Sequence, residues 1–348
     1  MKGVEIAIDR LPDGRGIALR LIDGALDDLL IDPPAALGPA QPGAIFAARS
    51  GRPMKGLGGM FVDLGPGGTG FLREAKGLAP GTLVPVQVTS VAEPGKAPPV
   101  TRRLLLKSRY TILTPGRPGR NLSRRIRDAE ERARLDGLVD AIALSAGDGL
   151  ILRSAAAGCD GQTLAEDIAT LTTLRETVFQ PAESPGLLLS AADAAFQAWR
   201  DWTDPLPDSV HDSAGCFADL GHWDRIDAVK SARIDLPAGA WISVEPTRAL
   251  VAVDVNTGPD TSPAAGLKAT IAALRALPRA LRLRGLGGVI VIDPAPFPKS
   301  ERKVLEQVAR ATFRTDPIET ALAGWSPLGH LELQRKRERR PIKDMLVQ

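Results

Sequence analysis

Cysteine and histidine are scarce in this chain, and their scarcity limits the kinds of site that it can build. Its 348 residues include two cysteines, Cys159 and Cys216, and three histidines, His211, His222 and His330. The two cysteines lie far apart in the sequence and form no metal-type pair, and with only three histidines a zinc site or a disulfide framework is not expected. We therefore expect no structural zinc, and the low cysteine content is typical of a reducing, cytoplasmic setting.

Long hydrophobic runs are also absent. No stretch reaches the roughly 18 apolar residues that a membrane-spanning helix needs, so no membrane partner is expected. The first residues, MKGVEIAIDRLPDG, reach Glu5 and Asp9 before an apolar signal-peptide core can form, so the sequence predicts no secretory signal. The glycine-rich GPGGTG stretch is not followed by Gly-Lys-Ser/Thr, which excludes a phosphate-binding P-loop.

The overall composition is that of an ordinary globular protein. Hydrophobic residues make up 44% and charged residues 24%, and the length allows two or three domains. The 44 basic residues slightly outnumber the 41 acidic ones, which gives a net charge of +3 and a pI near 9.0. This balance is a weak indication of polyanion binding, for which the distribution of charge matters more than its sum.

Short strands separated by turns dominate the first third of the chain. Residues 1–37 alternate apolar and polar side chains and predict two strands joined by a Pro-Asp-Gly turn. After the Pro/Gly-rich DPPAALGPAQPG, residues 43–107 contain short strands separated by glycines, a pattern typical of a small barrel. Apolar residues at helical spacing then predict helices in SRRIRDAEERARLDGLVDAIAL and GQTLAEDIATLTTLRETVFQ, and a shorter one in DAAFQAWRDW.

The C-terminal third places polar residues at the ends of two apolar strands. RALVAVDVNTG puts Asp254 and Asn256 on one face of a strand, because side chains alternate between faces. GGVIVIDPAPF likewise ends in Asp293, and a long helix at about 263–283 lies between the two strands. Such a crossover normally joins parallel strands, so we expect both aspartates at the carboxyl edge of one sheet, where α/β proteins bind ligands.

Two carboxylates that converge there would repel each other unless a cation lies between them. Oxygen ligands of this kind suit Mg²⁺, which takes one or two carboxylates and keeps several waters. The pattern therefore predicts a metal that activates water or polarises a phosphate. The alternative is structural, since Asp and Asn-Thr-Gly at strand ends are also common turn formers.

Several stretches, taken in order, resemble the ribonuclease E/G family. The similarity is carried by GMFVDLGPGGTGFL, GKAPPVTRRLLLKSRYTILTPG, NLSRRI, GLILRSAAAG, ALVAVDVNTG, LRLRGLGGVIVID and LGHLELQRKRERR. It covers most of the chain except the region around 185–230, where this chain is shorter. The resemblance implies an endoribonuclease that cleaves single-stranded RNA and leaves 5′-phosphate and 3′-hydroxyl ends. The sequence leaves the oligomeric state open.

For the fold, the resemblance implies a multidomain protein of α/β and β type. Its expected parts are N-terminal strands of a ribonuclease-H-like subdomain at 1–37, an OB-fold RNA-binding barrel at 38–108, an α+β 5′-monophosphate sensor region at 109–184, the shortened remainder of the ribonuclease-H-like subdomain at 185–230, and a catalytic deoxyribonuclease-like α/β subdomain with a mixed sheet at 231–348. The family's metal-binding aspartates fall on Asp254 and Asp293, and the asparagine that orients the site falls on Asn256. The implied cofactor is Mg²⁺, with Mn²⁺ as an alternative ion.

The resemblance also implies RNA-binding residues outside the metal site. Arg153 and Ser154 match the sensor of a 5′-monophosphate, to which Ile112 contributes main-chain atoms, and a guanidinium with a hydroxyl makes a strong phosphate site. Phe61 and Phe71 are the expected stacking surfaces of the barrel. Further predicted RNA contacts are Lys96, Arg124, Arg125, Arg335, Lys336 and Arg337, the last three in a basic run that also contains Arg339 and Arg340. The structural alternatives are a solvated arginine, phenylalanines that fill the barrel core, and a basic run that is merely solvated.

Some positions depart from the family pattern. Relatives carry a second acidic residue soon after the last aspartate, whereas this chain reads DPAPF, with Pro294, Ala295 and Pro296. Arg248 replaces a glutamate, which we expect to place a positive charge near the metal, and Ser90 stands where the OB-fold has a lysine. The chain also stops before the family's zinc-binding cysteine pair, so no zinc-linked dimer is expected.

These observations leave three hypotheses. The first is a Mg²⁺-dependent endoribonuclease stimulated by a 5′-monophosphate, acting in RNA processing or decay. The second is a non-catalytic RNA-binding protein that retains the nuclease scaffold, which DPAPF and Arg248 favour. The third, a metal-independent ribonuclease with paired histidines, is disfavoured because the three histidines are scattered in the sequence.

Overall fold

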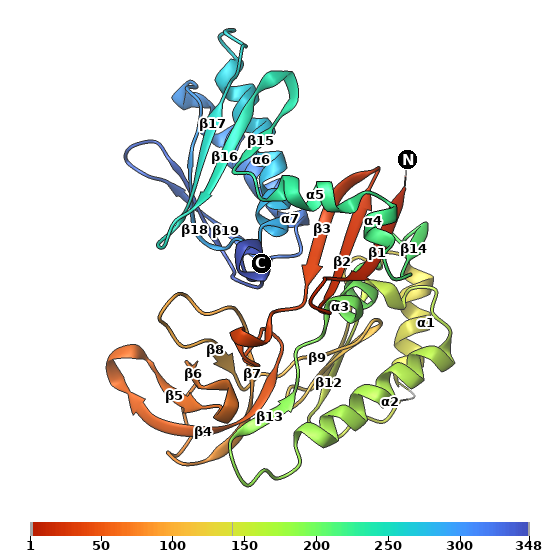
Figure 1. Ribbon diagram of the computed structural model, residues 1–348. Helices are drawn as coiled ribbons and strands as arrows, with labels where there is room; N and C mark the ends of the chain where they lie inside the picture. The colour runs from red at the N-terminus through yellow and green to blue at the C-terminus, as the bar shows by residue number, and fades with distance from the viewer. Residues whose placement is uncertain (1–2, 141, 347–348) are drawn as a thin grey trace. The chain divides into compact units, whose positions relative to one another are not determined.

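The computed structural model describes residues 3–140 and 142–346, and the chain forms two compact units (Figure 1). The first unit contains Met1–Gly24 and Leu30–Ser213. The second contains Ala25–Leu29 and Ala214–Gln348, so it takes one short segment from the N-terminal part of the sequence. No helix in the described residues has the length and hydrophobicity to cross a membrane.

The N-terminal strands form a sheet of order β14-β1-β2-β3. Its strands are β1 (Val4–Arg10), β2 (Gly16–Ile22), β3 (Ala25–Ile31) and β14 (Ser209–His211). β1 and β2 are antiparallel, joined at the predicted Pro-Asp-Gly turn, but the prediction of only two strands in residues 1–37 is wrong. Asp23 and Gly24, both with positive φ, turn the chain into β3, and an Asp-Gly pair is a strong signal for such a turn.

A closed barrel of five strands follows in the first unit. The strands are β4 (Ile45–Met54), β5 (Gly59–Asp63), β6 (Thr69–Leu72), β7 (Leu83–Val88) and β8 (Pro99–Thr101). Their order is β4-β5-β6-β8-β7, and β7 pairs back with β4; β6 and β8 are parallel and the other pairs antiparallel. This closed barrel is consistent with the predicted OB-fold. Its interior contains Phe46, Met60, Val62, Leu72 and Val86.

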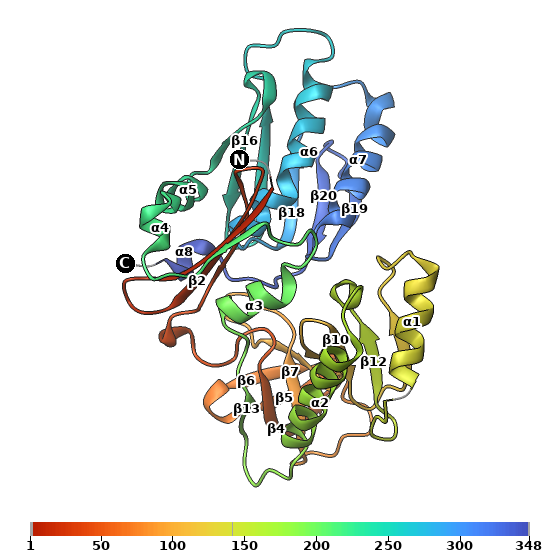
Figure 2. The same cartoon turned by 90° about the vertical axis from the view of Figure 1, so that its right-hand side faces the viewer.

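A separate four-stranded sheet of the first unit carries the predicted sensor motifs. Its order is β11-β12-β10-β9, with β9 (Leu106–Lys107), β10 (Thr111–Thr114), β11 (Gly119–Leu122) and β12 (Gly149–Leu152). The two helices predicted in this part of the sequence are confirmed as α1 (Ala129–Asp140) and α2 (Gly161–Val178), and α2 lies along β10 and β12 (Figure 2). α2 begins at Asp160, whose carboxylate accepts a hydrogen bond from the Thr163 amide and so caps the helix.

The remaining short elements connect these parts. In the first unit they are β13 (Gly186–Leu189), which pairs with β4, and α3 (Ala194–Asp201), which confirms the helix predicted in DAAFQAWRDW. In the second unit they are α4 (Cys216–Asp219), α5 (His222–Val229) and α8 (Ile342–Met345). Single 3₁₀ turns occupy Ala35–Leu37, Lys55–Leu57, Gly65–Gly67, Ser154–Ala156, Pro237–Gly239 and Lys299–Glu301.

The second unit is built on a mixed sheet of order β15-β16-β17-β18-β20-β19. The strands are β15 (Arg233–Asp235), β16 (Trp241–Pro246), β17 (Val251–Asn256), β18 (Gly288–Asp293), β19 (Thr320–Trp325) and β20 (Leu331–Arg335). β17 and β18 are parallel, because α6 (Ala265–Leu283) carries the chain between them, and the other neighbours are antiparallel. The predicted crossover and mixed sheet are therefore confirmed.

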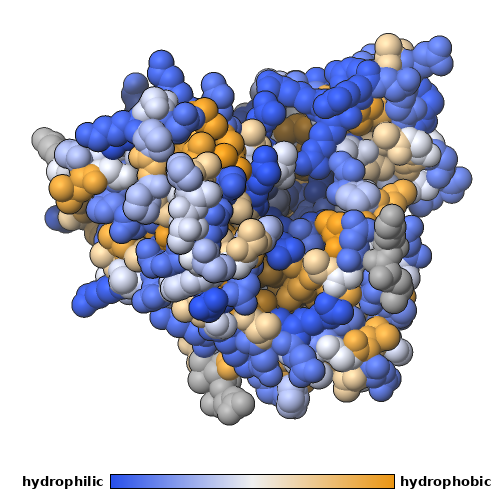
Figure 3. All heavy atoms as spheres, turned by 90° about the horizontal axis from the view of Figure 1, so that it is seen from above, coloured by the Kyte–Doolittle hydropathy of each residue, from blue (hydrophilic) through white to orange (hydrophobic). Residues whose placement is uncertain are grey.

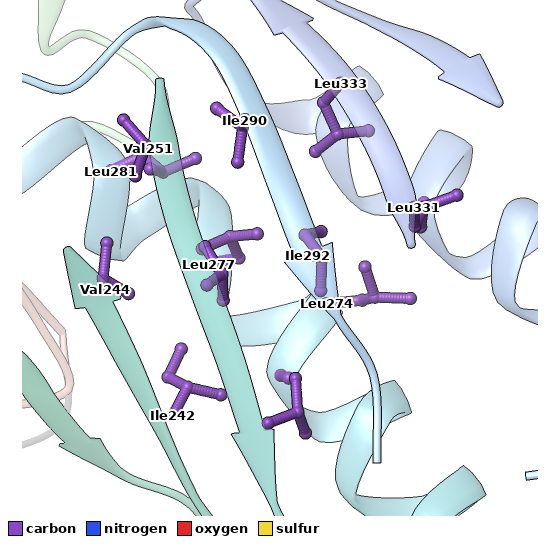
Figure 4. Packing of buried hydrophobic residues seen from close by; sticks show 14 of the residues in the cluster. Ile242, Val244, Val251, Leu274, Leu277, Leu281, Ile290, Ile292, Leu331 and Leu333 are labelled. Atoms are coloured by element: carbon purple, nitrogen blue, oxygen red, sulfur yellow. The ribbon is translucent and has the colours of Figure 1, made fainter. Parts of the chain in front are cut away.

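One face of this sheet packs on α6 and α7 (Arg302–Thr315), which lie side by side (Figures 1 and 2). Alternate strand residues point to this side, and Figure 4 shows them meeting leucines of α6. The packed residues shown there are Ile242, Val244, Val251, Ile290, Ile292, Leu331 and Leu333 from the strands and Leu274, Leu277 and Leu281 from α6. The intervening strand residues, including Asp254 and Asp293, are exposed on the opposite face.

A buried ionic network closes one end of this core. Arg335 continues the inward alternation of Leu331 and Leu333, and its side chain is fully buried. It donates hydrogen bonds to Asp316 at 2.8 Å and to Thr320 Oγ1 at 2.9 Å. Burial lowers the pKa of Arg335, and the charge of Asp316 opposes this shift. Because an unpaired buried charge is costly, this arginine and Asp316 depend on each other.

The network extends to the short segment that the second unit takes from β3. Arg282 of α6 pairs with Asp316 and with Asp27, the latter at 3.0 Å. Arg339 pairs with Asp28, whose carboxylate is almost fully buried. The network thereby ties Ala25–Leu29 to elements far away in the sequence.

We predict that Arg335→Ala lowers the free energy of unfolding of the second unit by about 3–5 kcal/mol, because it removes one partner of a buried ion pair. Lys336→Ala is the matched control: its ammonium is exposed and pairs with Glu338, so we expect a change within about 0.5 kcal/mol. Urea unfolding followed by circular dichroism measures both variants. Equal stabilities would show that the buried arginine does not support the core.

Candidate functional site

The two aspartates singled out in the sequence lie directly opposite each other. β17 and β18 pair in parallel with Asp254 in register with Asp293, and neighbouring strands are about 4.8 Å apart. Both side chains are on the exposed face of the sheet. Like charges directly opposite each other destabilise a strand pair, so this arrangement has an electrostatic cost that a cation would remove.

Two further side chains lie beside this pair of carboxylates. The amide Nδ2 of Asn256 donates a 2.8 Å hydrogen bond to Asp254 Oδ2, which fixes that carboxylate on the strand. Nε2 of His330 lies 3.8 Å from Asp293 Oδ1. Sequence reasoning did not include His330, which sits next to the aspartate because β20 pairs antiparallel with β18 and Ile292 is in register with Leu331.

The donor set is suitable for a hard divalent cation that keeps most of its waters. Mg²⁺ is commonly held by one or two carboxylates, and Asp254 and Asp293 supply two. The described residues contain no cluster of three or more His, Cys, Asp or Glu side chains suited to a metal, so the arrangement is not that of an all-protein cage. Oδ2 of Asp254 accepts the hydrogen bond from Asn256, and this bond would orient the carboxylate toward an ion.

The loop after Asp293 is held by a close backbone approach. A Cβ atom added to Gly266, in the first turn of α6, would lie 1.8 Å from the carbonyl oxygen of Pro296. Ala295 is buried in the core, and the Phe297 ring lies 5.6 Å from that of Trp325. The DPAPF stretch therefore packs against its own sheet and helix, and it contains no acidic residue after Asp293.

Arg248 is not close to the aspartates, and the expectation that it places a positive charge near the metal is wrong. It lies in the turn between β16 and β17, where the Thr247 amide bonds to the Leu250 carbonyl. Asp254 lies at the other end of β17, and the three residue steps from Val251 to Asp254 alone span about 10 Å.

Arg153, the predicted phosphate-sensing arginine, follows β12 and is partly buried in the first unit. Its Nη1 donates to the carbonyls of Ser108 at 2.6 Å and Arg200 at 3.1 Å, and its Nη2 pairs with Asp201 at 2.7 Å. These bonds use three of its five N–H groups, and no described residue accepts from the other two. The geometry fixes the guanidinium and leaves donors for an anion.

Asp201 is the acidic partner that sequence reasoning missed, and it also binds Arg200 at 2.7 Å. Burial raises the pKa of Asp201, but the hydrogen bonds and charges of Arg200 and Arg153 outweigh this and leave the pKa below its usual value. Asp201 is therefore a carboxylate at neutral pH. A phosphate bound at Arg153 would meet a guanidinium that already has one anionic partner.

The other predicted sensor and loop residues lie on neighbouring elements of the same sheet. Ser154 begins a 3₁₀ turn directly after Arg153. Ile112 lies in β10, paired with Lys107 of β9 on one side and with Ile151 of β12 on the other. Its main-chain contact with a phosphate stays a prediction. Arg124 and Arg125 are exposed in the loop after β11; Arg125 pairs with Asp204 at 3.2 Å, and the nearby Ser123 amide bonds to Leu152 at the end of β12.

Phe61 and Phe71 form a cross-strand pair on the barrel. They are in register on β5 and β6, and their ring centroids are 5.3 Å apart with the planes at 66°. Phe61 is 40% exposed, and neither ring belongs to the buried barrel core. Lys96, in the loop between β7 and β8, pairs with Glu93 on the surface. Phe71 is half-buried, and base stacking on this pair stays a prediction.

The basic run near the C-terminal strand is divided between the core and the surface. Arg335 is fully buried against Asp316, so it has no accessible donor for RNA, and we withdraw it from the predicted RNA-binding residues. Lys336 is exposed and pairs with Glu338, and Arg337 is half-buried beside Gly288. Arg339 belongs to the buried network through Asp28.

The chain is similar in sequence to known proteins. The model of the Ribonuclease E/G family matches residues 105–213 and 207–338. A protein of Nostoc sp. named Ribonuclease E is 31% identical over 367 residues, which cover 89% of this chain and 53% of that protein. The corresponding Synechocystis protein is also 31% identical, with 82% and 48% covered. The chain thus spans about half the length of these two relatives. A Salmonella typhimurium protein named Ribonuclease G is 27% identical, with 87% and 74% covered.

We predict that Mg²⁺ raises the thermal unfolding temperature of the wild-type chain but not that of Asp293→Asn, because the variant has one carboxylate for the ion. In chelator the variant should be as stable as the wild type or up to about 1 kcal/mol more stable, since a like-charge pair is removed. Asp235→Asn, on the edge strand β15, is the control and should keep the Mg²⁺ response. Differential scanning calorimetry in Mg²⁺ and in EDTA measures these unfolding temperatures. If Mg²⁺ raises the unfolding temperature of Asp293→Asn as much as that of the wild type, the predicted metal site is wrong.

Proposed function

Because the chain belongs to the ribonuclease E/G family, we propose that it is a Mg²⁺-dependent endoribonuclease that hydrolyses phosphodiester bonds of single-stranded RNA and leaves 5′-phosphate ends. The observation that carries this proposal is the in-register pair Asp254 and Asp293 on neighbouring parallel strands. A role in RNA processing or decay in the cytoplasm follows from the same proposal. We also propose the five-part domain layout, with its ribonuclease-H-like and deoxyribonuclease-like subdomains, that the sequence resemblance implies.

The residues of the second unit would divide the work of the metal site. Asp254 and Asp293 would hold the ion, and Asn256 would keep the Asp254 carboxylate in place through its 2.8 Å hydrogen bond. When bound, Mg²⁺ would supply a Lewis acid for the phosphate and lower the pKa of a coordinated water. Because both carboxylates lie on the open face of the sheet, a backbone phosphate can approach them from solvent.

The residues of the first unit would bind the RNA strand. The exposed Phe61–Phe71 pair would stack bases, and stacking tolerates any sequence because every base has a π-face. Lys96, Arg124 and Arg125 are on the surface of this unit and would neutralise phosphates. Arg153 and Ser154, with the main chain of Ile112, would recognise a 5′-monophosphate. Lys336 and Arg337 would be the phosphate contacts of the second unit.

We predict that purified protein cleaves a short single-stranded RNA in Mg²⁺ and not in EDTA, and that Asp254→Ala or Asp293→Ala lowers the rate at least about 10²-fold, because charge stabilisation at the phosphate is lost. Asp235→Asn should cleave at the wild-type rate. Gel analysis of a 3′-labelled oligonucleotide measures the products.

The alternative is a non-catalytic RNA-binding protein, which the DPAPF stretch favours because it lacks an acidic residue present in relatives. Tight RNA binding without cleavage in either Mg²⁺ or Mn²⁺ would support that alternative. Cleavage that persists in EDTA would instead indicate metal-independent chemistry and would contradict both.

We predict that RNA with a 5′-monophosphate is cleaved faster than the same RNA with a 5′-triphosphate, and that Arg153→Ala removes the difference. A lost charge-assisted phosphate contact corresponds to about 10–150-fold. Arg124→Ala is the control: it removes another predicted phosphate contact, which would slow cleavage of both RNAs alike, but it leaves the hydrogen bonds of Arg153 unchanged and should keep the difference between the two RNAs. Equal rates on both RNAs for the wild type would end the sensor proposal and leave the nuclease proposal standing.

A further inference from the structure

Helix α3 exposes two aromatic side chains although it already has a buried face. Ala194, Ala198 and Trp202 recur at intervals of four residues and are buried. Phe196 and Trp199, three residues apart, lie on another side of the helix and are 43% and 47% exposed. Figure 3 shows hydrophobic residues exposed among hydrophilic ones on one face of the molecule. Two large aromatics together on one short helix face are unusual for a purely structural role.

The two rings form a contiguous surface bordered by arginines. Their centroids are 5.5 Å apart, and the planes are tilted by 34°, close to an offset stack. The guanidinium of Arg109 lies 5.2 Å from the Trp199 ring centroid, and Arg109 also donates to the Trp199 carbonyl. The guanidinium of Arg200 lies 5.8 Å from the Phe196 ring. Aromatic faces next to cations are the combination that binds single-stranded nucleic acid.

This aromatic pair is attached to the phosphate-sensing arginine through the main chain. Arg153 donates to the carbonyl of Arg200 and pairs with Asp201, the two residues that directly follow Trp199. Ser108, whose carbonyl also accepts from Arg153, directly precedes Arg109. Trp199 and the arginine beside it, Arg109, are therefore each one residue away from a residue that accepts a hydrogen bond from Arg153.

We propose that Phe196 and Trp199 form a stacking subsite for the first base of an RNA whose 5′-phosphate lies at Arg153. The charge of the surroundings favours a nucleotide, because Arg109, Arg153 and Arg200 bring three cations to this part of the surface, against the one carboxylate of Asp201 that pairs with two of them. This subsite deepens the proposed function and rests on it. Stacking recognises any base, so the subsite would read the presence of a terminal nucleobase and not its identity.

The test is binding of a 2′-O-methyl RNA oligonucleotide, which resists cleavage, with a 5′-monophosphate and a 3′ fluorophore. We expect Trp199→Ala to weaken binding about 5–150-fold when the first nucleotide has a base, and to have little effect when that nucleotide is abasic. Trp199→Phe should restore most of the affinity, because the ring is retained. Fluorescence anisotropy in EDTA, which keeps the metal site empty, measures the binding of wild type and both variants to each of the two RNAs.

Phe179→Ala is the matched control. Phe179 is also about as exposed, at 41%, and also lies under an arginine, with Arg175 4.8 Å from its ring. It stands at the end of α2, about 18 Å along the helix from Asp167, the residue that binds Ser108. We expect Phe179→Ala to bind both RNAs as the wild type does.

The outcomes separate this inference from the proposed function. Equal affinity of Trp199→Ala and wild type for the base-bearing RNA, with Arg153→Ala still weakened, would overturn the stacking subsite alone. An equal loss on the abasic RNA would also overturn it, because the tryptophan would then act through structure. Failure of the wild type to bind 5′-phosphorylated RNA at all would overturn the proposed function and the subsite with it.

Discussion

The parallel pairing of β17 with β18 is the constraint on which the candidate site depends. A shift of one residue in this register would turn one carboxylate into the core, because strand side chains alternate. α6 sets the pairing: its leucines pack on both strands, and its first turn, at Gly266, admits the carbonyl of Pro296 so closely that no other residue can replace the glycine without movement. The apolar core thus determines where two like charges meet.

Part of the site follows from the sequence by simple alternation. Period two places Asp254 with Asn256, and the same rule applied to Leu331, Leu333 and Arg335 would have shown that this arginine faces the core. The basic composition of the run around Arg335 does not reveal that this side chain is buried. The crossover at 263–283 was enough to predict parallel strands, and the spacing of short strands was enough to predict a barrel. The third N-terminal strand was missed although Asp23-Gly24 signalled it.

The rest depends on pairings that no local pattern contains. His330 lies beside Asp293 because β20 is the antiparallel neighbour of β18, and Asp201 reaches Arg153 from a helix 48 residues further along the chain. These partners decide whether a charged side chain is free for a ligand. Three arginines illustrate this: Arg335 is buried in the core, Arg153 is partly buried and uses some of its N–H groups within the protein, and Arg124 is exposed. Net charge alone therefore says little about where an RNA can bind.

The ionic network of the second unit has a consequence for biosynthesis. Arg282 follows Asp27 by 255 residues and Arg339 follows Asp28 by 311. During synthesis neither aspartate can pair with its arginine until the chain has been made as far as that arginine. A fragment starting at Ala214 would lack these two anions and would have to bury arginine without them. Folding of the second unit is thus coupled to the pentapeptide Ala25–Leu29, which is made long before the rest of that unit.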